Sequence, residues 1–394
     1  MLGDSCDSKL QHKGILQLIT IRVFFSRRGA EVVSLVFLRI IILTFPHSHI
    51  PTLITFAPVN DPTSASRKQD HIELAFKSQS SAAENDGRFY YEPVMGFHQA
   101  EVSLKTTFLG KTLGMPLWIS SMTGGTEQAG TINKRLAEAC AEFGLGMGLG
   151  STRRLLDDNT WFEDFNLRPV IGPELPFFAN LGIAQVESLL AERKTDKIHA
   201  LIARLQADGL IIHINPLQEW FQPEGDRFRR SPLETIQEFI ESADYQVIVK
   251  EVGQGMGPAS IKALLQLPID ALDFGAFGGT NFSKLELLRN RSGDASLYED
   301  LAYIGHTAAE MTGFVNEAVW ELGDKVQCKQ IIVSGGIGNF LDGYWCMEKL
   351  PLNSIYAQGS AFLKFAQQDS EALKNYIVSQ REGLILCKQF LRVR

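Results

Sequence analysis

Between residues 116 and 357 the chain repeats one pattern eight times, and this repetition constrains the fold more than any other feature. Each repeat starts with a short apolar run, passes through a turn rich in Gly or polar residues, and continues in most cases into a stretch with helical periodicity. Most of the runs are continuously apolar, as expected for parallel strands that are covered on both faces. Eight such units in succession predict an α/β protein whose strands close into a parallel (β/α)8 TIM barrel. The predicted strands are 116–120, 144–148, 176–179, 209–213, 246–250, 269–273, 330–334 and 354–357.

Most of the connections between these strands contain a predicted helix, and two of them are unusually long. Pro232 and Pro258 stand near the starts of two predicted helices, where the missing N–H of proline does no harm. Two connections are longer than the rest, 221–230 after the fourth strand and 281–300 after the sixth. Both would lie at the C-terminal rim of the barrel, where loops usually carry function. The clearest predicted helices are 128–143, 186–206, 233–243 and 258–267.

Length and charge narrow the range of functions. The 394 residues accommodate one barrel of roughly 250 residues with extensions. The net charge of −7 argues against a nucleic-acid partner, which normally requires a basic face. Any anionic ligand must therefore be held by local Arg, Lys and backbone N–H groups. The five cysteines are scattered without a CxxC pair, which predicts reduced thiols in a cytoplasmic protein.

Residues 1–58 differ from the predicted barrel domain, 59–394. They carry six Lys or Arg against three Asp or Glu, a local charge of +3 in an otherwise acidic chain. The apolar stretch 32–45 contains Arg39 and is too short to span a bilayer comfortably. It is also placed wrongly for a signal peptide. A membrane-surface segment is one alternative; we favour a disordered extension or a start assigned too far upstream.

The fourth strand ends in the densest polar cluster of the chain. His213 and Asn215 share one face of an extended segment, because strand side chains alternate with a period of two. Gln218 and Glu219 follow Pro216, where a loop would leave the strand. One carboxylate beside an amide and an imidazole suits acid–base work and Mg²⁺, which prefers oxygen ligands. The simpler alternative is a strand end whose polar residues face water.

Other strand ends present further groups. Small residues around Ser121, Met122 and Thr123 allow close approach of a flat ligand, although they also suit a packed, flexible turn. Ser151, Thr152 and Arg153 form a hydroxyl and guanidinium cluster that suits phosphate, unless they are simply solvated. The third strand ends at Asn180.

Lys250 ends the apolar run 247–249, which is an unusual place for a lysine. It could neutralise an anionic cofactor or form a Schiff base. The structural alternative is an ion pair with a carboxylate on a neighbouring strand.

Glycine-rich turns follow the last three strands. Residues 275–281 supply glycines and the hydroxyl of Thr280, and 334–339 and 358–360 follow strands seven and eight. Loops in these last two positions form the usual phosphate site of a barrel, with backbone N–H groups and a helix N-terminus facing the anion. Ahead of the barrel, Arg67 and Lys68 could grip a diphosphate, although adjacent charges are more often solvated.

Taken together, residues 66–364 resemble type 2 isopentenyl diphosphate isomerase, the FMN-dependent class. The resemblance implies a barrel that binds FMN, Mg²⁺ and NADPH (or NADH), and a homo-oligomeric isomerase of isoprenoid biosynthesis. It implies interconversion of isopentenyl and dimethylallyl diphosphate by acid–base proton transfer with reduced FMN. The matching motifs are Arg67-Lys68 with His71, 121–125, 150–153, Asn180, His213-x-Asn215-x-x-Gln218-Glu219, 250–253, 278–280 and 334–336.

Residue roles follow from the same resemblance. Glu219 would hold Mg²⁺, and Gln218, His213 and Asn215 would be the catalytic residues. The substrate would contact Arg67, Lys68, His71, Ser151, Thr152, Arg153 and Gln218. FMN would contact Ser121, Met122, Thr123, Ser151, Asn180, Lys250 and Thr280, with Gly336, Ile337, Gly338, Gly359 and Ser360 around its phosphate.

Two positions depart from the family pattern. Gly338 stands where the family often has Arg, and Gly275 where it often has Ser. Phosphate binding would therefore depend more on backbone N–H groups.

Four rival functions predict different residues. An α-hydroxy-acid oxidase requires a His base and an Arg near the end of strand seven, where this chain has glycines and Asn339. An inosine-monophosphate-dehydrogenase-like enzyme requires a Cys on a rim loop, whereas Cys140 lies within a helix and Cys328 precedes strand seven. A Schiff-base aldolase would be colourless, and a non-catalytic scaffold would leave the 213–219 cluster without a task.

Overall fold

The computed structural model describes residues 64–99, 101–120, 127–289 and 293–394, together with the short antiparallel pair β1 (Gln17–Thr20) and β2 (Arg39–Ile42). The chain forms two compact units, residues 1–84 and 85–394. The first unit contains β1, β2, the helix α1 (Ser64–Leu74) and a 3₁₀ turn (Ala82–Glu84). The predicted boundary at residue 58 lies outside the described residues and stays a prediction.

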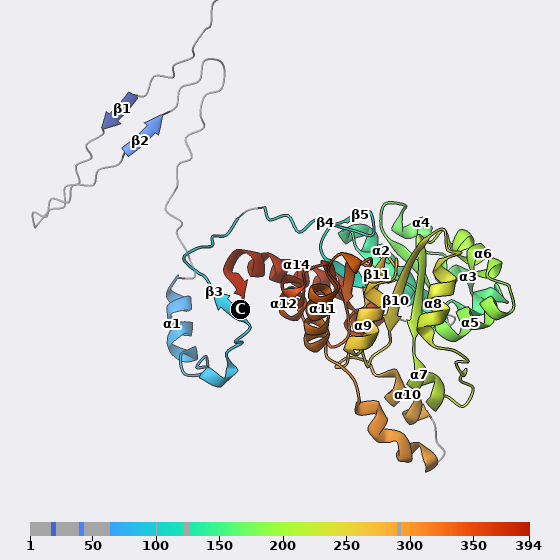
Figure 1. Cartoon of the computed structure of the whole chain (residues 1–394). Coiled ribbons are helices and arrows are strands. Elements are labelled where there is room, and N and C mark those ends of the chain that lie inside the picture. Colours follow the sequence, from blue (N-terminus) through green and yellow to red (C-terminus); the bar gives the residue numbers. More distant parts are fainter. Residues whose placement is uncertain (1–16, 21–38, 43–63, 100, 121–126, 290–292) are drawn as a thin grey trace, which may run out of the picture. The chain divides into compact units, whose positions relative to one another are not determined.

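The second unit is built on a closed barrel of eight parallel strands (Figure 1), which confirms the predicted fold. Each predicted apolar run forms one strand, and neighbouring strands follow the order of the chain. The ring closes where the last strand pairs with the first, Tyr356 opposite Leu117. The strands are β6 (Leu117–Ile119), β7 (Gly146–Gly148), β8 (Phe177–Gly182), β9 (Gly209–Ile214), β10 (Gln246–Glu251), β11 (Ala271–Asp273), β12 (Gln330–Val333) and β13 (Asn353–Gln358).

The continuous apolar runs are explained by burial on both faces of the barrel wall. All three residues of β6 and all six of β8 are buried. Trp118, Phe177 and Phe178 are among the largest side chains with no solvent exposure. Burying one such side chain stabilises a fold by about 1.5–3 kcal/mol, so the wall and its helices form the main core.

Helices cover the outside of the barrel (Figure 1). Pro232 and Pro258 lie in the first turns of their helices, as predicted, and Ser231 caps the first of them by accepting from Glu234 N–H. The helices that follow the strands are α2 (Glu127–Phe143), α5 (Ile183–Ala191), α6 (Asp196–Leu205), α8 (Pro232–Ile240), α9 (Pro258–Leu265), α11 (Ala308–Leu322), α12 (Phe340–Lys349), α13 (Ser360–Gln368) and α14 (Ser370–Phe390).

Two expectations about helices were wrong. The single helix predicted over 186–206 is two helices, α5 and α6, because Arg193 adopts φ of 53° between them and ends the first. The loop predicted after Pro216 is the short helix α7 (Pro216–Phe221), since proline is well accommodated in a first helical turn.

Shorter elements fill the connections at the rim. The connection after β7 holds a 3₁₀ turn (Arg153–Leu156), α3 (Phe162–Phe165) and α4 (Arg168–Ile171). The connection after β11 holds α10 (Phe282–Arg289) and a long 3₁₀ segment, η3 (Gly293–Tyr303). A last 3₁₀ turn (Gly323–Lys325) lies on the opposite side of the barrel, before the N-terminal end of β12.

A hairpin of β4 (Thr106–Phe108) and β5 (Lys111–Leu113) lies against the N-terminal ends of the barrel strands. Lys111 Nζ lies 2.5 Å from Asp208 Oδ1, and the buried guanidinium of Arg168 lies 2.8 Å from Asp208 Oδ2. Removing one partner of this network would leave a partly buried charge uncompensated, so the network fixes how the hairpin lies on the face opposite the rim.

A second small sheet joins segments from the two ends of this unit. β3 (Phe89–Tyr91) pairs antiparallel with β14 (Leu391–Val393). This pairing ties the segment that precedes the barrel to the end of the chain beyond α14.

Candidate active site

Polar side chains from neighbouring strands meet at the C-terminal rim, as the sequence predicts. The strand register places Gly182 opposite His213, His213 opposite Lys250, and Lys250 opposite Asp273. Asn180 extends this row on β8 and Ser334 extends it beyond β12. Five consecutive strands therefore contribute one polar belt at the mouth of an otherwise apolar barrel.

The orientation of His213 is fixed by Asn180. The Asn180 side-chain N–H₂ donates to Leu149 O at 3.0 Å, so its Oδ1 faces His213 Nδ1 at 2.7 Å. An acceptor at that distance requires the hydrogen on Nδ1, which leaves Nε2 as an acceptor. Burial, with a smaller contribution from the Lys250 ammonium, lowers the pKa of His213 to about 4. The imidazole is therefore neutral near pH 7.

Gly182 leaves the space that this imidazole needs. A Cβ atom at position 182 would come within 3.0 Å of His213 Nε2 and 2.4 Å of Gln185 Oε1. A side chain there would displace the ring, so the glycine is part of the site.

Lys250 is buried and its ammonium lies 3.7 Å from Asp273 Oδ2. It also donates to Glu251 O at 2.9 Å. The ion pair anticipated as a structural alternative is therefore present, although it does not exclude a role toward a cofactor. Burial raises the pKa of Asp273 while Lys250 and Ser334 oppose the shift. Asp273 was missed by sequence reasoning, although an acidic residue ending an apolar strand was the available signal.

Asn215 organises the cluster that follows β9. It lies at the N-cap of α7, and its side-chain N–H₂ donates to Gln218 Oε1 and to Glu219 Oε1, both at 3.0 Å. Asn215 therefore holds Gln218 and Glu219 side by side, while His213 turns toward β8. The cluster is compact, as the spacing predicts, but a helical turn rather than a loop brings it together.

Glu219 offers a limited set of oxygen ligands for a metal ion. Its side chain is buried, and Oε2 accepts from Asp226 N–H at 2.7 Å. Asn215 Oδ1 is buried without a hydrogen-bond partner in the described structure, which makes it a second hard oxygen beside the carboxylate. These donors fit Mg²⁺ if the ion keeps waters or ligand oxygens in its remaining positions. Among the described residues there is no group of three or more His, Cys, Asp or Glu that could hold a metal.

Asp226 connects the predicted metal residue with the predicted phosphate residue. Arg153 Nη1 lies 3.0 Å from Asp226 Oδ2, and Gln185 Nε2 donates to the same oxygen at 2.8 Å. Asp226 also supplies the N–H that binds Glu219. Sequence reasoning missed Asp226, because nothing in the order of residues 221–230 shows which polar side chain faces the site.

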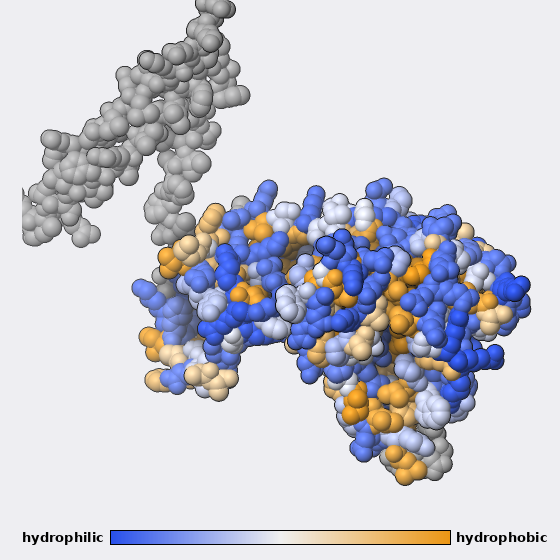
Figure 2. Space-filling model, in the orientation of Figure 1, coloured by the Kyte–Doolittle hydropathy of each residue, from blue (hydrophilic) through white to orange (hydrophobic). Residues whose placement is uncertain are grey.

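The second long connection supports Gln218 from outside the barrel. Gln218 Nε2 lies 3.4 Å from Oε1 of the buried Glu286 on α10, and Arg289 pairs with Glu286 and Glu224. Both insertions therefore lie at the rim, as predicted, and they contact each other through Arg289 and Glu224. Figure 2 shows apolar side chains gathered on the surface around α10 and η3, where Leu288, Leu297 and Ile304 are exposed.

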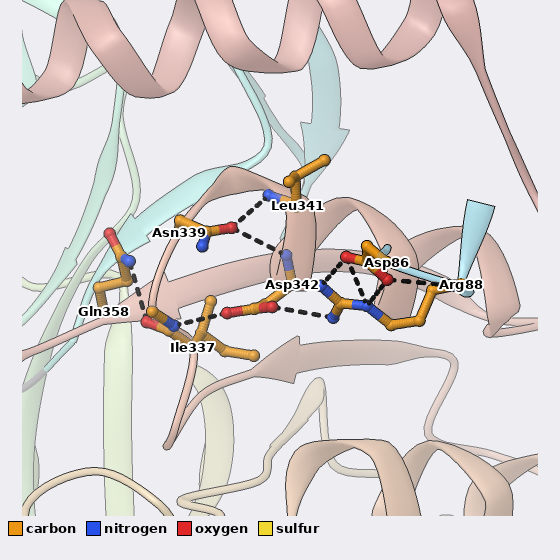
Figure 3. Close-up of polar contacts among 8 residues, drawn as sticks. Asp86, Arg88, Ile337, Asn339, Leu341, Asp342 and Gln358 are labelled. Atoms are coloured by element: carbon orange, nitrogen blue, oxygen red, sulfur yellow. Dashed lines mark hydrogen bonds and ion pairs between the residues drawn. The ribbon is translucent and has the colours of Figure 1, made fainter. Parts of the chain in front are cut away.

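The two Gly-rich loops after β12 and β13 and the glycine turn after β11 form a narrow cradle. Gly335 and Gly336 have φ of 84° and 69°, and Gly336 Cα would lie 3.2 Å from a Cβ at Gly278 in the turn after β11, which leaves no room for side chains. Gln358 Nε2 donates to Ile337 O at 3.0 Å (Figure 3) and fixes the loop after β12 to the loop after β13. Among the described residues, the N–H groups of Gly336 and Ile337 have no acceptor. Free N–H groups in a glycine cradle fit a phosphate.

The remaining predicted residues fall into three groups. Thr152 is fully buried and its hydroxyl donates to Asn180 O at 2.7 Å, whereas Ser151, Thr280 and Ser360 are exposed near the rim. Arg67, Lys68 and His71 lie on α1 in the first unit. Ser121, Met122 and Thr123 lie outside the described residues. All their binding roles stay predictions.

The comparisons with known proteins place the chain in a family. No family model matches the sequence. Among curated proteins, the isopentenyl-diphosphate delta-isomerase of Rickettsia felis is 32% identical over 343 residues, 84% of this chain and 94% of the relative. That of Pelodictyon phaeoclathratiforme is 34% identical over 293 residues, 70% of this chain and 80% of the relative. A solved flavocytochrome b2 mutant with benzoylformate is 11% identical, with a TM-score of 0.53 over 77% of this chain and 76% of that one.

The structural match supports the fold alone, that of a (β/α)8 barrel. The sequence matches are more specific, because they extend over most of each relative. The chain belongs to the isopentenyl-diphosphate delta-isomerase family, and the resemblance to its type 2 members is confirmed.

The neutral state of His213 gives a test of the site geometry. We expect its imidazole to titrate near pH 4 by NMR, with the resonance assigned by comparison with His213→Gln. Because the folded pKa lies below the unfolded value of about 6.5, the unfolded chain takes up the proton first as the pH falls. The free energy of unfolding should therefore fall progressively as the pH is lowered from about 6.5 to 4. The His213→Gln variant should lack the part of this fall that His213 causes. A midpoint near 6.5 would show that His213 is solvated.

Proposed function

We propose that this protein interconverts isopentenyl and dimethylallyl diphosphate with bound FMN and Mg²⁺. The observation that carries the proposal is the cluster in which Asn215 holds Gln218 and Glu219 together at the barrel mouth. The membership of the chain in an isomerase family supports the same reaction. The cluster combines a carboxylate, two amides and a neutral imidazole, which can bind a metal–diphosphate and orient protons.

FMN would occupy the barrel mouth, with its phosphate in the glycine cradle. The free N–H groups of Gly336 and Ile337 support this placement. Reduction by NADPH or NADH would make bound FMN an acid–base group beside the substrate. The protein would contact it through Ser121, Met122, Thr123, Ser151, Asn180, Lys250 and Thr280, and would hold its phosphate with Gly336, Ile337, Gly338, Gly359 and Ser360.

Mg²⁺ would be held by Glu219, with Asn215 Oδ1 as a candidate second ligand. The metal would then bind the diphosphate, and Arg153 would provide a cation on the same side, since Asp226 links it to Glu219. Arg67, Lys68 and His71, with Ser151 and Thr152, complete the predicted substrate contacts. Binding energy from the diphosphate can hold the distant alkene in a reactive pose.

Gln218 would position the proton that moves between the two carbons. An amide is a poor acid or base, so it orients rather than holds that proton. Its own orientation is set by Asn215 on one side and Glu286 on the other. His213, neutral and with a free Nε2, would accept a hydrogen bond from the substrate or from a water molecule.

An FMN-dependent α-hydroxy-acid oxidase is the alternative, because it shares the barrel. Such an enzyme requires a His base and an Arg after the seventh strand. Residues 334–342 contain neither. The isomerase is therefore favoured by the rim chemistry as well as by the relatives.

The proposal extends to the assembly and its setting. The exposed apolar side chains on α10 and η3 would suit an interface between copies, which supports a homo-oligomer. Buried, unpaired cysteines at 140, 328, 346 and 387 are compatible with the cytoplasm, which is the compartment we propose. In the described part of the chain no helix has the length and apolar character needed to cross a membrane.

The function is tested directly by the colour and activity of the purified protein. We expect a flavin absorption spectrum that bleaches on anaerobic addition of NADPH, and conversion of isopentenyl diphosphate only in the reduced state with Mg²⁺ present. NMR of the product distinguishes isomerisation from oxidation. A colourless protein, or oxidation of an α-hydroxy acid without isomerisation, would reject the proposal.

Glu219→Gln tests the metal assignment. The amide keeps the shape but cannot balance a divalent charge, so we expect retained FMN and loss of most Mg²⁺-dependent activity. Glu224→Gln, on the neighbouring loop, removes an exposed carboxylate that pairs with Arg289 and should leave the Mg²⁺ requirement unchanged. An unchanged Mg²⁺ titration in Glu219→Gln would show that the metal binds elsewhere.

Gln218→Asn tests the positioning of the proton. The shorter side chain withdraws the amide by roughly 1.5 Å, beyond hydrogen-bond tolerance. Misplacement on that scale costs on the order of a hundredfold in turnover. FMN binding, flavin reduction and substrate affinity should be nearly intact, and Gln222→Asn at the C-cap of the same helix serves as the control. If substrate affinity falls while turnover is unchanged, Gln218 is a binding residue.

A further inference from the structure

An arginine from outside the barrel reaches the proposed phosphate cradle. Arg88 lies just before β3, 254 residues ahead of its partner Asp342 in the first turn of α12. Its Nη1 donates to Asp342 Oδ1 at 2.8 Å, and its Nε and Nη2 donate to Asp86 (Figure 3). The guanidinium is about one-third exposed, so it is held in place but remains accessible.

Asp342 is an unexpected residue at an anion site. Its Oδ2 accepts from Gly338 N–H at 2.9 Å, so a carboxylate lies against the loop that would hold a phosphate. Asn339 already accepts from the N–H groups of Leu341 and Asp342. The helix end is therefore capped by its own side chains, and an uncompensated Asp342 would repel a phosphate in the cradle.

The loop itself lacks a cation that could offset this charge, because residues 334–342 contain no Lys or Arg. Arg88 supplies a positive charge from outside the loop. It is shared between Asp342 and Asp86, so it offsets part of the Asp342 charge. It also fixes the Asp342 carboxylate toward Gly338, which keeps that loop in one conformation.

We propose that Arg88 favours FMN binding by offsetting the charge of Asp342 at the phosphate cradle, so that it acts as a positioning residue for the cofactor site. This inference rests on the proposed function, because it requires FMN in the barrel. Arg88 provides this positive charge from the segment before the barrel. Asp342 can then order the loop without repelling the phosphate.

The test is a double-mutant cycle on FMN affinity. The full-length protein is freed of flavin, and FMN and riboflavin are titrated by quenching of flavin fluorescence. We expect Arg88→Gln to weaken FMN binding by at least about tenfold, since a carboxylate and a phosphate a few ångströms apart repel strongly. Riboflavin, which lacks the phosphate, should bind the variant as it binds the wild type. Arg394→Gln is the control, because Arg394 contacts Tyr90 and Gly87 rather than α12.

The second substitution decides the mechanism. Asp342→Asn in the Arg88→Gln background should restore FMN affinity to within about threefold of the wild type, because the uncompensated charge is gone. A phosphate-specific loss that persists in the double variant would overturn this role of Arg88. Equal losses for FMN and riboflavin, or no loss at all, would overturn it as well. If the wild type binds no FMN, the proposed function fails instead; if it binds FMN and Arg88→Gln is unchanged, only this inference fails.

Discussion

Closure of the strand ring is the constraint on which the rest of the structure depends. β13 pairs with β6 through Tyr356, Ala357 and Gln358 opposite Leu117, Trp118 and Ile119. The pairing continues at the rim, where Ser120 N–H donates to Gln358 O at 3.0 Å. Because all strands are parallel, a closed ring brings every carboxyl end to the same opening. Residues 180, 213, 250, 273 and 334 become neighbours because they lie at the carboxyl ends of five consecutive, directly paired strands of this ring.

The polar belt is costly in such an apolar barrel. Lys250 and Asp273 are buried and His213 is partly buried, and a buried ion pair often stabilises a fold no better than apolar residues would. Lys250 is partnered by Glu251 O and Asp273, and His213 by Asn180. Among the described residues, Asp273 Oδ2 has only the ion pair with Lys250 at 3.7 Å and no hydrogen bond. A belt with such defined donors and acceptors can hold a ligand in one orientation.

The sequence predicts the barrel well because its signal is local. Continuous apolar runs and N-terminal prolines depend only on nearby residues, and all eight strands were found. The break at Arg193 was missed, because the apolar residues keep their helical spacing on both sides of it. The positive φ of Arg193 that ends the first helix leaves no trace in that spacing. The helical turn after Pro216 was missed because a proline marks both loop starts and first turns.

The candidate site was predictable only in part, and for a different reason. His213, Asn215, Gln218 and Glu219 are neighbours in the chain, so their clustering could be foreseen. The residues that support the site are distant in the chain and could not be foreseen. Glu286 lies 68 positions from Gln218, and at the glycine cradle Arg88 lies 254 positions from Asp342. The periodicity of a sequence does not show which acidic side chain of a long loop faces the site. Such contacts can be identified only in the folded structure.

The two long connections have a shared role that explains their position. Asn215 fixes Gln218 and Glu219 from the barrel side, through a side chain at the end of β9. The backbone of Asp226 binds Glu219 from the first insertion, and Glu286 meets Gln218 from the second. Two flexible polar side chains are thereby held from opposite sides. The short helix α7 alone would leave these side chains free to adopt several rotamers, and selecting one of them costs conformational entropy. The contacts from the two insertions restrict the cluster to a single geometry.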